Sequence, residues 1–335
     1  MTETSSGRGQ TILVTGGAGY VGSHACKALA AAGYQPVVYD NLSRGHRDAV
    51  KWGPLIEGNI LDRDRMEWAL REVQPAAVMH FAAYAYVGES MATPSMYFDN
   101  NVTGTARLLE AMQATGVRTL VFSSSCAVYG GVHEAPIDEN TPCDPSSFYG
   151  QTKLNCEQLI RGFVRNHGFS AVALRYFNAA GSDPDNEIGE NHDPEPHIIP
   201  VVLRVAAGLE DKVTLNGADH PTPDGTCVRD FVHVSDLAQA HGLALARALQ
   251  STRKFEIFNL GVGKGFSLNE IVAAAKRVTG REIPVSYAER RPGDPPYAVG
   301  KADRAQTILG WQPRHTGIDA ALQHAWRWML QSHKL

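Results

Sequence analysis

The sequence has 335 residues, of which 43 % are hydrophobic and 20 % are charged, and its formal net charge is −4. At roughly 150 residues per domain this length corresponds to about two domains, and the composition is that of a folded globular protein rather than a disordered or fibrous one. The small net charge and the lack of a Lys/Arg-rich run argue against a partner that is a nucleic acid or an anionic membrane. Small molecules are therefore the expected partners.

The expected compartment is the cytoplasm. No apolar run reaches the roughly 20 residues of a membrane-spanning helix, and the opening residues, MTETSSGRGQ, lack the apolar core of a signal peptide. The cysteines are scattered and include no C-x-x-C pair, which suits a reducing environment and argues against structural zinc. They are Cys26, Cys126, Cys143, Cys156 and Cys227.

Short apolar runs alternate with helical patterns in the first half of the chain. We interpret them as parallel strands buried on both faces. They cover residues 11–14, 36–39, 76–79, 119–122 and 171–174. Between the first two, small and apolar residues recur at helical spacing from Val21 to Ala32, and Gly33 follows as a helix stop. This order predicts an α/β fold with a Rossmann-like, doubly wound parallel sheet.

The second half of the chain has a different texture. The stretch from Ser182 to Pro196 is acidic and rich in Asp, Asn and Pro, which predicts a long surface loop, and a helix is expected over residues 268–278. We expect a first domain over residues 11–176 and a smaller α/β lobe over residues 177–335, some of whose segments return to the first domain. A ligand cleft is expected between the two.

A glycine loop, GGAGYVG from Gly16 to Gly22, directly follows the first strand and opens the first helix. Backbone N–H groups and the helix dipole converge there, which suits a pyrophosphate, although such a loop can also be only a tight turn. Asp40 ends the second strand, 18 residues after Gly22. Its carboxylate can bind the adenine ribose 2′-hydroxyl and would repel a 2′-phosphate, which favours NAD over NADP. The alternative is a strand-end cap formed with Asn41.

Two further motifs carry polar groups. Tyr149 and Lys153 lie four residues apart, on one face of a helix expected to begin near Tyr149. A nearby lysine and a cationic nicotinamide would favour the phenolate, so the pair can relay a proton, but the same spacing occurs on ordinary surface helices. The run from Ser123 to Ser125 follows a strand at the ligand-binding edge of the sheet, where a hydroxyl can bind a substrate oxygen or cap a helix.

In this order and spacing, the motifs resemble the extended short-chain dehydrogenase/reductase family. Within it, further blocks are similar to the UDP-glucose 4-epimerase group: VMHFAAYAYVGES (78–90), DNNVTGT (99–105), RYFNAAGSDP (175–184), DGTCVRDFVHVSDLA (224–238) and RRPGD (290–294). The resemblance runs from residue 11 to about residue 330. It implies an NAD-dependent isomerase that epimerises UDP-glucose and UDP-galactose through a transient 4-keto sugar. It also implies a homodimer joined through the helices over residues 95–115 and 149–167.

The resemblance also assigns roles to single residues. Tyr149 would be the acid/base at the sugar 4-hydroxyl, Lys153 would hold the NAD ribose and lower the tyrosine pKa, and Ser125 would bind the reacting oxygen. The residues implied to bind NAD, besides Tyr149 and Lys153, are Gly16, Gly19, Tyr20, Val21, Gly22, Asp40, Asn41, Asn59, Ile60, Phe81, Ala82, Ala83, Asn100, Ser123, Tyr176 and Phe177. Those implied to bind the UDP-sugar, besides Ser125 and Tyr149, are Asn178, His197, Ile198, Thr214, Asn216, Arg229, Arg291, Asp294 and Ala298.

Several positions depart from the family pattern. Ala85 replaces a cofactor-binding lysine, and Asn59 replaces an aspartate whose oxygen would accept from the adenine amino group. Near the uridine, Asn216 stands for an aromatic residue and His197 for an asparagine. Ala298 occupies the place of a tyrosine found in relatives restricted to glucose and galactose, which predicts room for N-acetylated UDP-hexosamines.

Parts of this pattern also fit other functions. A UDP-xylose/UDP-arabinose or other sugar-nucleotide 4-epimerase would share every catalytic residue, and the blocks AYVGES and RPGD fit it. A non-catalytic NAD sensor is expected to lack the tyrosine, lysine or serine, and Asp40 opposes a reductase with exchangeable NADPH. The arginines could also form surface ion pairs with Asp230 or Asp294. His192 and His197 have no metal-binding spacing, so we interpret their segment as a solvated loop and expect no metal.

Overall fold

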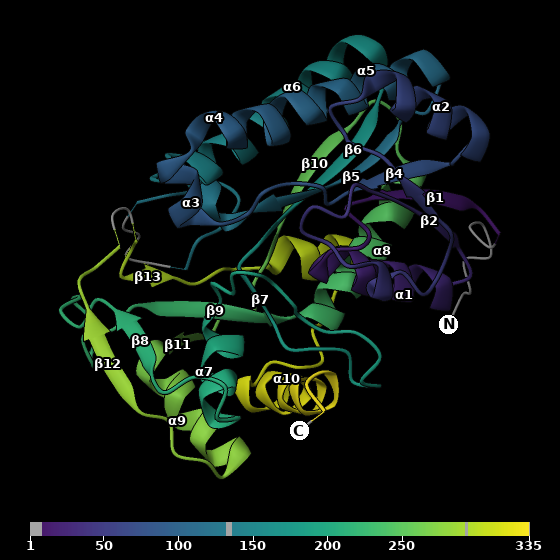
Figure 1. Cartoon of the computed structure of the whole chain (residues 1–335). Coiled ribbons are helices and arrows are strands. Elements are labelled where there is room, and N and C mark those ends of the chain that lie inside the picture. The colour runs from purple at the N-terminus through teal and green to yellow at the C-terminus, as the bar shows by residue number, and fades with distance from the viewer. Residues whose placement is uncertain (1–8, 132–135, 292–293, 335) are drawn as a thin grey trace.

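The computed structural model describes residues 9–131, 136–291 and 294–334. Its centre is a seven-stranded sheet in the order β10-β6-β5-β4-β1-β2-β3, with every neighbouring pair parallel (Figure 1). The strands are β1 (Thr11–Thr15), β2 (Gln35–Asp40), β3 (Leu55–Glu57), β4 (Ala77–His80), β5 (Thr119–Ser125), β6 (Ser170–Tyr176) and β10 (Phe255–Leu260). The doubly wound parallel sheet predicted from the sequence is confirmed.

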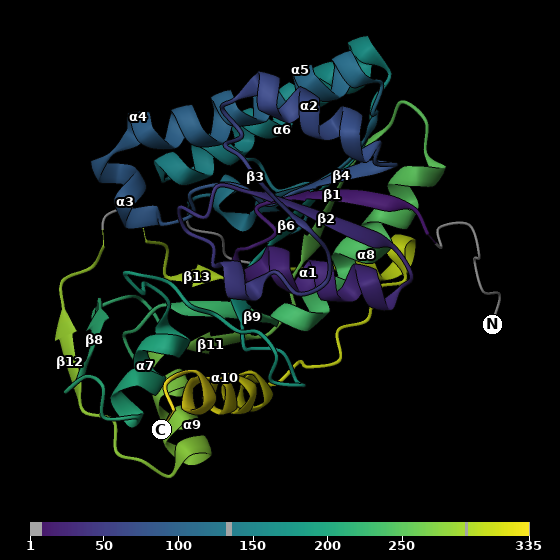
Figure 2. The ribbon, with the colours of Figure 1, turned by 45° about the vertical axis from the view of Figure 1, so that its right-hand side comes forward.

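Helices cover both faces of this sheet, as Figure 2 shows. On one face lie α2 (Arg63–Val73), α5 (Gly104–Thr115) and α6 (Phe148–His167), and on the other lie α1 (Tyr20–Ala31) and α8 (Val234–Gln250). Successive side chains of β1 enter opposite layers, because Ile12 and Val14 join the core under α1 and α8 whereas Leu13 joins the core under α2 and α5. All three are fully buried, as a strand sandwiched between helices requires.

A smaller unit adjoins the carboxyl edge of the sheet. Its strands are β7 (Asn178–Ala180), β9 (Val228–His233), β11 (Gly265–Ser267) and β13 (Tyr297–Ala298) around β9, with β8 (Val213–Asn216) and β12 (Val285–Ala288) as a separate pair. Three helices pack together beneath them: α7 (Ile198–Ala206), α9 (Leu268–Thr279) and α10 (Ile318–Ser332). A hydrophobic cluster of its own, with Leu203, Ile271 and Leu322 fully buried, holds this unit together.

The chain passes repeatedly between the two units. One residue separates β6 in the large sheet from β7 in the small one, and α8 begins immediately after β9 ends at His233. After α8, β10 joins the edge of the large sheet beside β6, and the chain then returns to β11. A π-helical turn, η4 (Ala305–Leu309), packs against α8 and β10 before the chain reaches α10.

Short elements complete the large unit. They are η1 (Arg47–Ala49), α3 (Val87–Ala92), α4 (Pro94–Tyr97), the π-helical turn η2 (Phe98–Thr103) and η3 (Cys126–Val128). None of the helices in the described ranges combines the length and the apolar character that crossing a bilayer requires.

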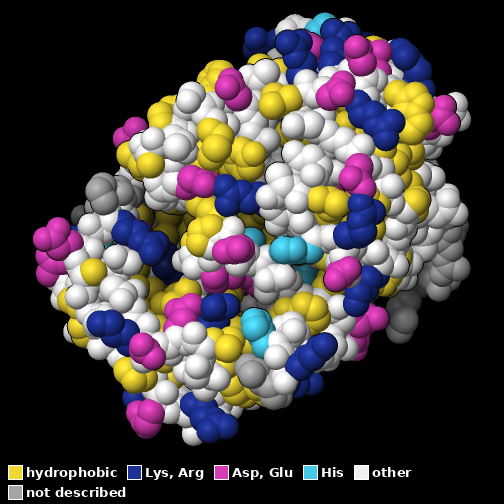
Figure 3. Space-filling model, viewed as in Figure 1, with side chains coloured by type: hydrophobic (Ala, Val, Ile, Leu, Met, Phe, Trp, Pro, Cys, Tyr) yellow, Lys and Arg dark blue, Asp and Glu magenta, His cyan; other side chains and the backbone are white. Residues whose placement is uncertain are grey.

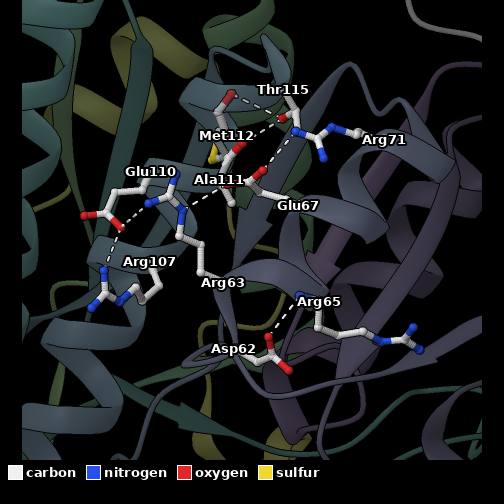
Figure 4. Close-up of polar contacts among 10 residues, drawn as sticks. All are labelled: Asp62, Arg63, Arg65, Glu67, Arg71, Arg107, Glu110, Ala111, Met112 and Thr115. Atoms are coloured by element: carbon white, nitrogen blue, oxygen red, sulfur yellow. Dashed lines mark hydrogen bonds and ion pairs between the residues drawn. The ribbon is translucent and has the colours of Figure 1, made fainter.

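The outer surface of α2 and α5 is held by charged side chains (Figure 4). Asp62 caps α2 by accepting from the N–H of Arg65 at 2.9 Å. Arg63 bonds Glu67 at 2.9 Å within α2 and reaches Glu110 of α5 at 3.6 Å. These side chains are exposed or half-buried, so each pair contributes about 0–1 kcal/mol and the apolar interface beneath them does most of the stabilising.

Buried neutral histidines make stability depend on pH. Burial lowers the pKa of His24 and of His241 to about 4 and that of His80 to about 3, below the unfolded value of 6.5. Between these values the unfolded chain binds more protons than the folded one, so stability present at pH 7 is lost as the pH falls below 6.5. We expect a loss of roughly 1–2 kcal/mol per histidine by pH 5.

Urea unfolding at pH 7, 6 and 5 measures this effect. The variant His241→Phe keeps a ring beside Phe81, 4.7 Å away between centroids, and removes one titrating group. It should therefore show a shallower decline of unfolding free energy with falling pH. A wild-type free energy that stays constant over this range would contradict the assignment.

Candidate functional site

A cavity of about 1380 Å³ lies where the carboxyl edge of the large sheet faces the small unit, and Figure 3 shows a hollow between the two. It exceeds the roughly 300–1,000 Å³ of an ordinary small-molecule site, which leaves room for two ligands side by side. The structure brings together at its wall all the site residues predicted from the sequence except Asn59 and Lys153.

The glycine loop packs tightly against neighbouring backbone. Gly16 has φ +73°, and a Cβ there would lie 2.4 Å from the backbone nitrogen of Ala82. A Cβ on Gly22 would lie 2.2 Å from the carbonyl oxygen of Gly16. Gly19 is the N-cap of α1 and offers no side chain to the first backbone N–H groups of the helix. The loop therefore presents free N–H groups and a helix dipole to the cavity, a cradle that fits a pyrophosphate.

Asp40 lies at the end of β2 and combines the two roles considered for it. Its carboxylate oxygens accept from the N–H of Ala18 at 3.0 Å and from the N–H of Leu42 at 2.8 Å, so it does cap the strand end. It also lines the cavity, where each oxygen retains a lone pair for a ribose hydroxyl. Burial raises its pKa. One carboxylate thus fixes the glycine loop and can mark the ribose position.

Asn59 lies outside the cavity. Its side chain is exposed, and its amide oxygen accepts from the N–H of Leu61 at 2.9 Å in a local turn. Its neighbours Gly58 and Ile60 do line the cavity, and the hydroxyl of Tyr39 donates to the Asn59 carbonyl at 3.0 Å. The side-chain contact to adenine expected for Asn59 therefore stays a prediction.

The three serines of β5 alternate between the cavity and the core. Ser123 and Ser125 line the cavity, whereas Ser124 points away and donates to Glu157 at 2.6 Å. The Ser123 hydroxyl lies 2.7 Å from the hydroxyl of Tyr176. The Ser125 hydroxyl accepts from the N–H of Ala127 at 3.1 Å and so caps η3, the structural role considered for it. Its own proton is available to Tyr149 or to a ligand.

Tyr149 stands beside Ser125 at the start of α6. The helix is capped by Ser147, and Tyr149 is 8 % exposed with its ring in the cavity wall. Burial raises the pKa of Tyr149, and a hydrogen bond from Ser125 acts in the opposite direction. The phenol is therefore protonated at neutral pH before any ligand binds.

Lys153 lies below Ser123 and Tyr149, on the side away from the cavity. Its ammonium donates to the carbonyl oxygen of Ser123 at 2.7 Å and lies 5.9 Å from the centroid of the Tyr149 ring. It is 3 % exposed, and burial lowers its pKa to about 8. The lysine remains a cation at neutral pH and stands one layer below the cavity surface.

The opposite end of the cavity is cationic. Arg229 donates to the carbonyl of Val228 at 2.9 Å and forms an ion pair with Asp294, one of the two alternatives considered for it. Asp230 is instead buried and accepts from backbone N–H groups of residues 262, 263 and 300. With the amide of Asn216 oriented so that its oxygen faces Arg291, the orientation that satisfies both groups, the oxygen accepts from Nε and Nη2 at 3.2 and 3.1 Å. Pro292 and Gly293 of the RRPGD block lie outside the described residues.

Sequence reasoning missed a group at the mouth of the cavity. Arg44 pairs with Glu89 at 2.7 Å, and its guanidinium lies over the rings of Tyr84 and Tyr86 at 5.3 and 5.1 Å. All four residues line the cavity. The tyrosines flank Ala85, where the sequence departs from the family pattern, and this departure was the signal in the sequence that the stretch from Tyr84 to Tyr86 has its own contacts.

The segment from residue 182 to residue 197 contains neither helix nor strand, as predicted, but part of it is not solvated. The side chains of Glu190, Glu195 and His192 are only 5, 10 and 15 % exposed. The interpretation as a solvated loop is therefore wrong for Glu190, His192 and Glu195, whereas Asp185, Asn191 and Asp193 of the same segment are exposed. The ring of His192 packs edge-on against the rings of Tyr20 and Tyr86, a contact that its position in the sequence did not reveal.

Comparison with known proteins agrees with this geometry. Residues 12–261 match the NAD dependent epimerase/dehydratase family. The chain belongs to this family. It is 47 % identical over 317 residues to the UDP-glucose 4-epimerase of Rhizobium meliloti (strain 1021), covering 95 % of this chain and 96 % of that protein. The family resemblance inferred from the motifs is confirmed.

Solved structures of this family share the whole fold. The UDP-glucose 4-epimerase of Brucella ovis, in complex with NAD, superposes with a TM-score of 0.91 at 46 % identity, covering 95 % of this chain and 98 % of that one. The enzyme of Stenotrophomonas maltophila, with bound NAD and formylated UDP-arabinopyranose, gives 0.92 at 38 % identity, covering 97 % and 99 %. Members of this family thus accommodate both ligands in the fold described here.

Proposed function

We propose that the protein is an NAD-dependent UDP-sugar 4-epimerase that interconverts UDP-glucose and UDP-galactose. The observation that carries this proposal is that Tyr149 and Ser125 line one cavity together with the glycine loop and with Arg229 and Arg291. One cavity thus offers a pyrophosphate cradle, a proton-transfer pair and two guanidinium groups, which a dinucleotide, a reacting sugar and a second diphosphate would require. The comparisons with UDP-glucose 4-epimerases support the same conclusion.

The cofactor end fits NAD. The glycine loop would hold the pyrophosphate, Asp40 the adenine ribose, and Lys153, together with Tyr149, the nicotinamide side. When bound, NAD supplies a hydride acceptor that can give the hydride back to the sugar, so no cofactor is consumed. The carboxylate of Asp40 opposes a 2′-phosphate, which makes NADP the poorer ligand.

Tyr149 moves the proton in both halves of the reaction. The positive charges of Lys153 and of a bound oxidised nicotinamide would lower the pKa of Tyr149, so that its phenolate takes the proton of the sugar 4-hydroxyl, and the phenol returns it once the sugar has turned its other face. Ser125 binds the same sugar oxygen and favours the phenolate through its hydrogen bond to Tyr149. Lys153 holds its positive charge close behind the ring and favours the phenolate in the same way. The proton and hydride both return, so the net redox change is zero.

The substrate diphosphate would lie at the cationic end. Guanidinium groups stay charged and bind phosphate oxygens in pairs, and Arg229 and Arg291 both line the wall there. Asp294 orients Arg229, and Asn216 orients Arg291 through its amide oxygen. We infer that Asn178, Thr214, His197 and Ile198 complete the uridine and sugar contacts, since all four line the same cavity.

The identity of the sugar is a separate question from the reaction type. A UDP-pentose is the second candidate, because the Stenotrophomonas maltophila structure is described with formylated UDP-arabinopyranose bound. An NAD sensor without chemistry is disfavoured, because the tyrosine, serine and lysine are all present and lie together.

An NMR assay tests the proposal and ranks the sugars. The purified protein, with no cofactor added, is incubated separately with UDP-galactose, UDP-GalNAc and UDP-arabinose, and the anomeric protons are followed. Conversion of UDP-galactose to UDP-glucose is expected without added NAD. Absence of conversion in every tube, even with NAD supplied, would overturn the epimerase assignment and leave the family membership intact.

Ala298 should set the width of the sugar pocket. It lies on β13 beside Arg229 and lines the cavity with a single methyl group. A tyrosine there would fill the space that an N-acetyl group needs, so Ala298→Tyr should lower the ratio of UDP-GlcNAc to UDP-glucose turnover by about tenfold, a difference of about 1.4 kcal/mol. Ala298→Ser is the matched small control, and an unchanged ratio in the tyrosine variant would contradict this role.

We also infer a homodimer in the cytoplasm. The outer helices α5 and α6 lie side by side over one face of the sheet (Figure 2), and Met91 and Phe98 near them are 50 and 43 % exposed. An apolar surface of this kind suits a second copy of the chain. All five cysteines are free, which fits a reducing compartment. Light scattering of the purified protein measures the oligomeric state.

A further inference from the structure

Two imidazoles and two carboxylates meet on the segment between β7 and α7. One ligand atom from each of Glu190, His192, Glu195 and His197 lies within 4.8 Å of all the others. His197 is the N-cap residue of α7, and the other three lie on the preceding irregular segment. Figure 3 shows histidine and acidic side chains grouped beside the hollow on this face of the molecule.

The spacing of these atoms is that of ligands around one metal ion. Nδ1 of His192 lies 3.3 Å from Oε1 of Glu190 and 3.6 Å from Oε1 of Glu195, and Nδ1 of His197 lies 3.5 Å from Oε1 of Glu195. Donors held at 2.0–2.2 Å around a tetrahedral ion are separated by about 3.3–3.6 Å. The remaining contact, His197 to Glu190, is a 2.5 Å hydrogen bond whose proton an ion would replace.

A second observation points to a ligand at the same place. Nδ1 of His192 is shielded from solvent and has no hydrogen-bond partner, although two carboxylates flank it. The nitrogen contacts only the carboxylates of Glu190 and Glu195, at ion-pair distances, so it faces other metal-ligand atoms and a cation could take the place of its proton. The rings of Tyr20 and Tyr86 stand edge-on to His192, with centroids at 6.2 and 5.8 Å, and close the site from the side.

The other ligand-rich group in the described part of the chain behaves differently. Asp183, Asp185 and Glu187 also gather closely, but the ammonium of Lys27 lies 2.7 Å from an oxygen of each. Their charge is already balanced by a cation of the protein. In the histidine-containing group the carboxylates form ion pairs only with the two imidazoles, whose protons a metal ion can replace.

We propose that Glu190, His192, Glu195 and His197 bind one divalent transition-metal ion of the zinc type as a structural site. Mixed imidazole and carboxylate donors suit Zn²⁺, and four protein ligands leave no open position for catalysis. The ion fastens the irregular segment to the first turn of α7. Because Glu190, His192, Glu195 and His197 all line the cavity, the ion fixes one wall of it. This inference does not rest on the proposed function.

Metal content measured by mass spectrometry tests the site. The full-length protein is loaded with Zn²⁺, passed through a desalting column and analysed, with about one ion per chain expected to remain. Replacing Zn²⁺ by Co²⁺ should give the intense visible bands of a four-coordinate ion. His192→Ala and Glu195→Gln should each weaken retention by at least about tenfold. Asp193→Asn, which removes an exposed carboxylate from the same segment, should retain the ion.

Each outcome supports or overturns the site. Failure of the wild-type protein to retain Zn²⁺, or equal retention by His192→Ala and wild type, would overturn it. Weak Co²⁺ bands typical of six-coordination would overturn the closed four-ligand site. Circular dichroism confirms that the variants are folded, and if they are not, the Co²⁺ spectrum of the wild type decides. None of these readouts requires turnover, so their failure would leave the epimerase proposal standing.

Discussion

Tyr149→Phe should reduce kcat by about 10²–10⁴-fold, the range that a positioned general acid/base contributes. The substitution removes one oxygen and keeps the ring that fills the cavity wall at 8 % exposure, so the fold and NAD retention should survive. Progress of UDP-galactose conversion is followed by NMR, and retained NAD is measured after denaturation of the purified variant. A loss of activity that merely parallels a loss of NAD would contradict the assigned role.

The matched control is Tyr129→Phe. Tyr129 is fully buried outside the cavity and donates to Asn259 at 2.6 Å, so loss of its hydroxyl tests the effect of removing a buried phenol oxygen without touching the site.

Ser125→Ala tests the proton transfer through its pH dependence. Its hydrogen bond opposes the rise in the pKa of Tyr149, so the acidic limb of the pH–rate profile should move to higher pH in this variant. A shift to lower pH would contradict the arrangement.

Glu157→Gln should destabilise the protein by about 3–5 kcal/mol, as expected when one partner of a buried ion pair is removed. Glu157 accepts two bonds from Arg175, at 2.9 and 2.5 Å, and one from Ser124 at 2.6 Å. The two charged side chains are only 3 and 5 % exposed. The carboxylate of Glu157 raises the pKa of Arg175. The substitution leaves the Arg175 guanidinium buried next to β5 without a counter-charge.

Urea unfolding compares this variant with two others. Glu67→Gln removes a carboxylate from the surface of α2, where the ion pair contributes about 0–1 kcal/mol, and should change stability little. Combining Glu157→Gln with Arg175→Met removes both charges and should recover part of the loss. If Glu157→Gln and Glu67→Gln cost the same free energy, the buried pair has no special role.

The large sheet could be predicted where each strand carries its own signal. β1, β2, β4, β5 and β6 are apolar runs buried on both faces, so five of the strands appeared in the sequence as continuous β-rich segments. β10 has the sequence FEIFNL, in which a buried glutamate and asparagine interrupt the apolar run. Glu256 is held by Arg247 and Lys254, partners that only the folded chain supplies.

Some residues of the site could likewise be predicted from local patterns, whereas others are placed only by the folded chain. Glycine spacing, the strand-end carboxylate and the tyrosine–lysine interval are local patterns, and the structure brings their residues to one cavity. The expectation for Asn59 came from its replacing an aspartate of the family pattern, but the direction of its side chain depends on a local turn. The group around His192 has no helical spacing, because an irregular segment folds back on itself to assemble it.

The path of the chain between the two units also determines which fragments could fold on their own. Cutting after β6 would not yield two units that fold on their own, because the C-terminal piece would take α8 and β10 with it. The N-terminal piece would then lose an edge strand and one of the helices that cover Ile12 and Val14. The two halves of the cavity are therefore built by interleaved stretches of one polypeptide, and a gene cut at that point would encode two incomplete sheets.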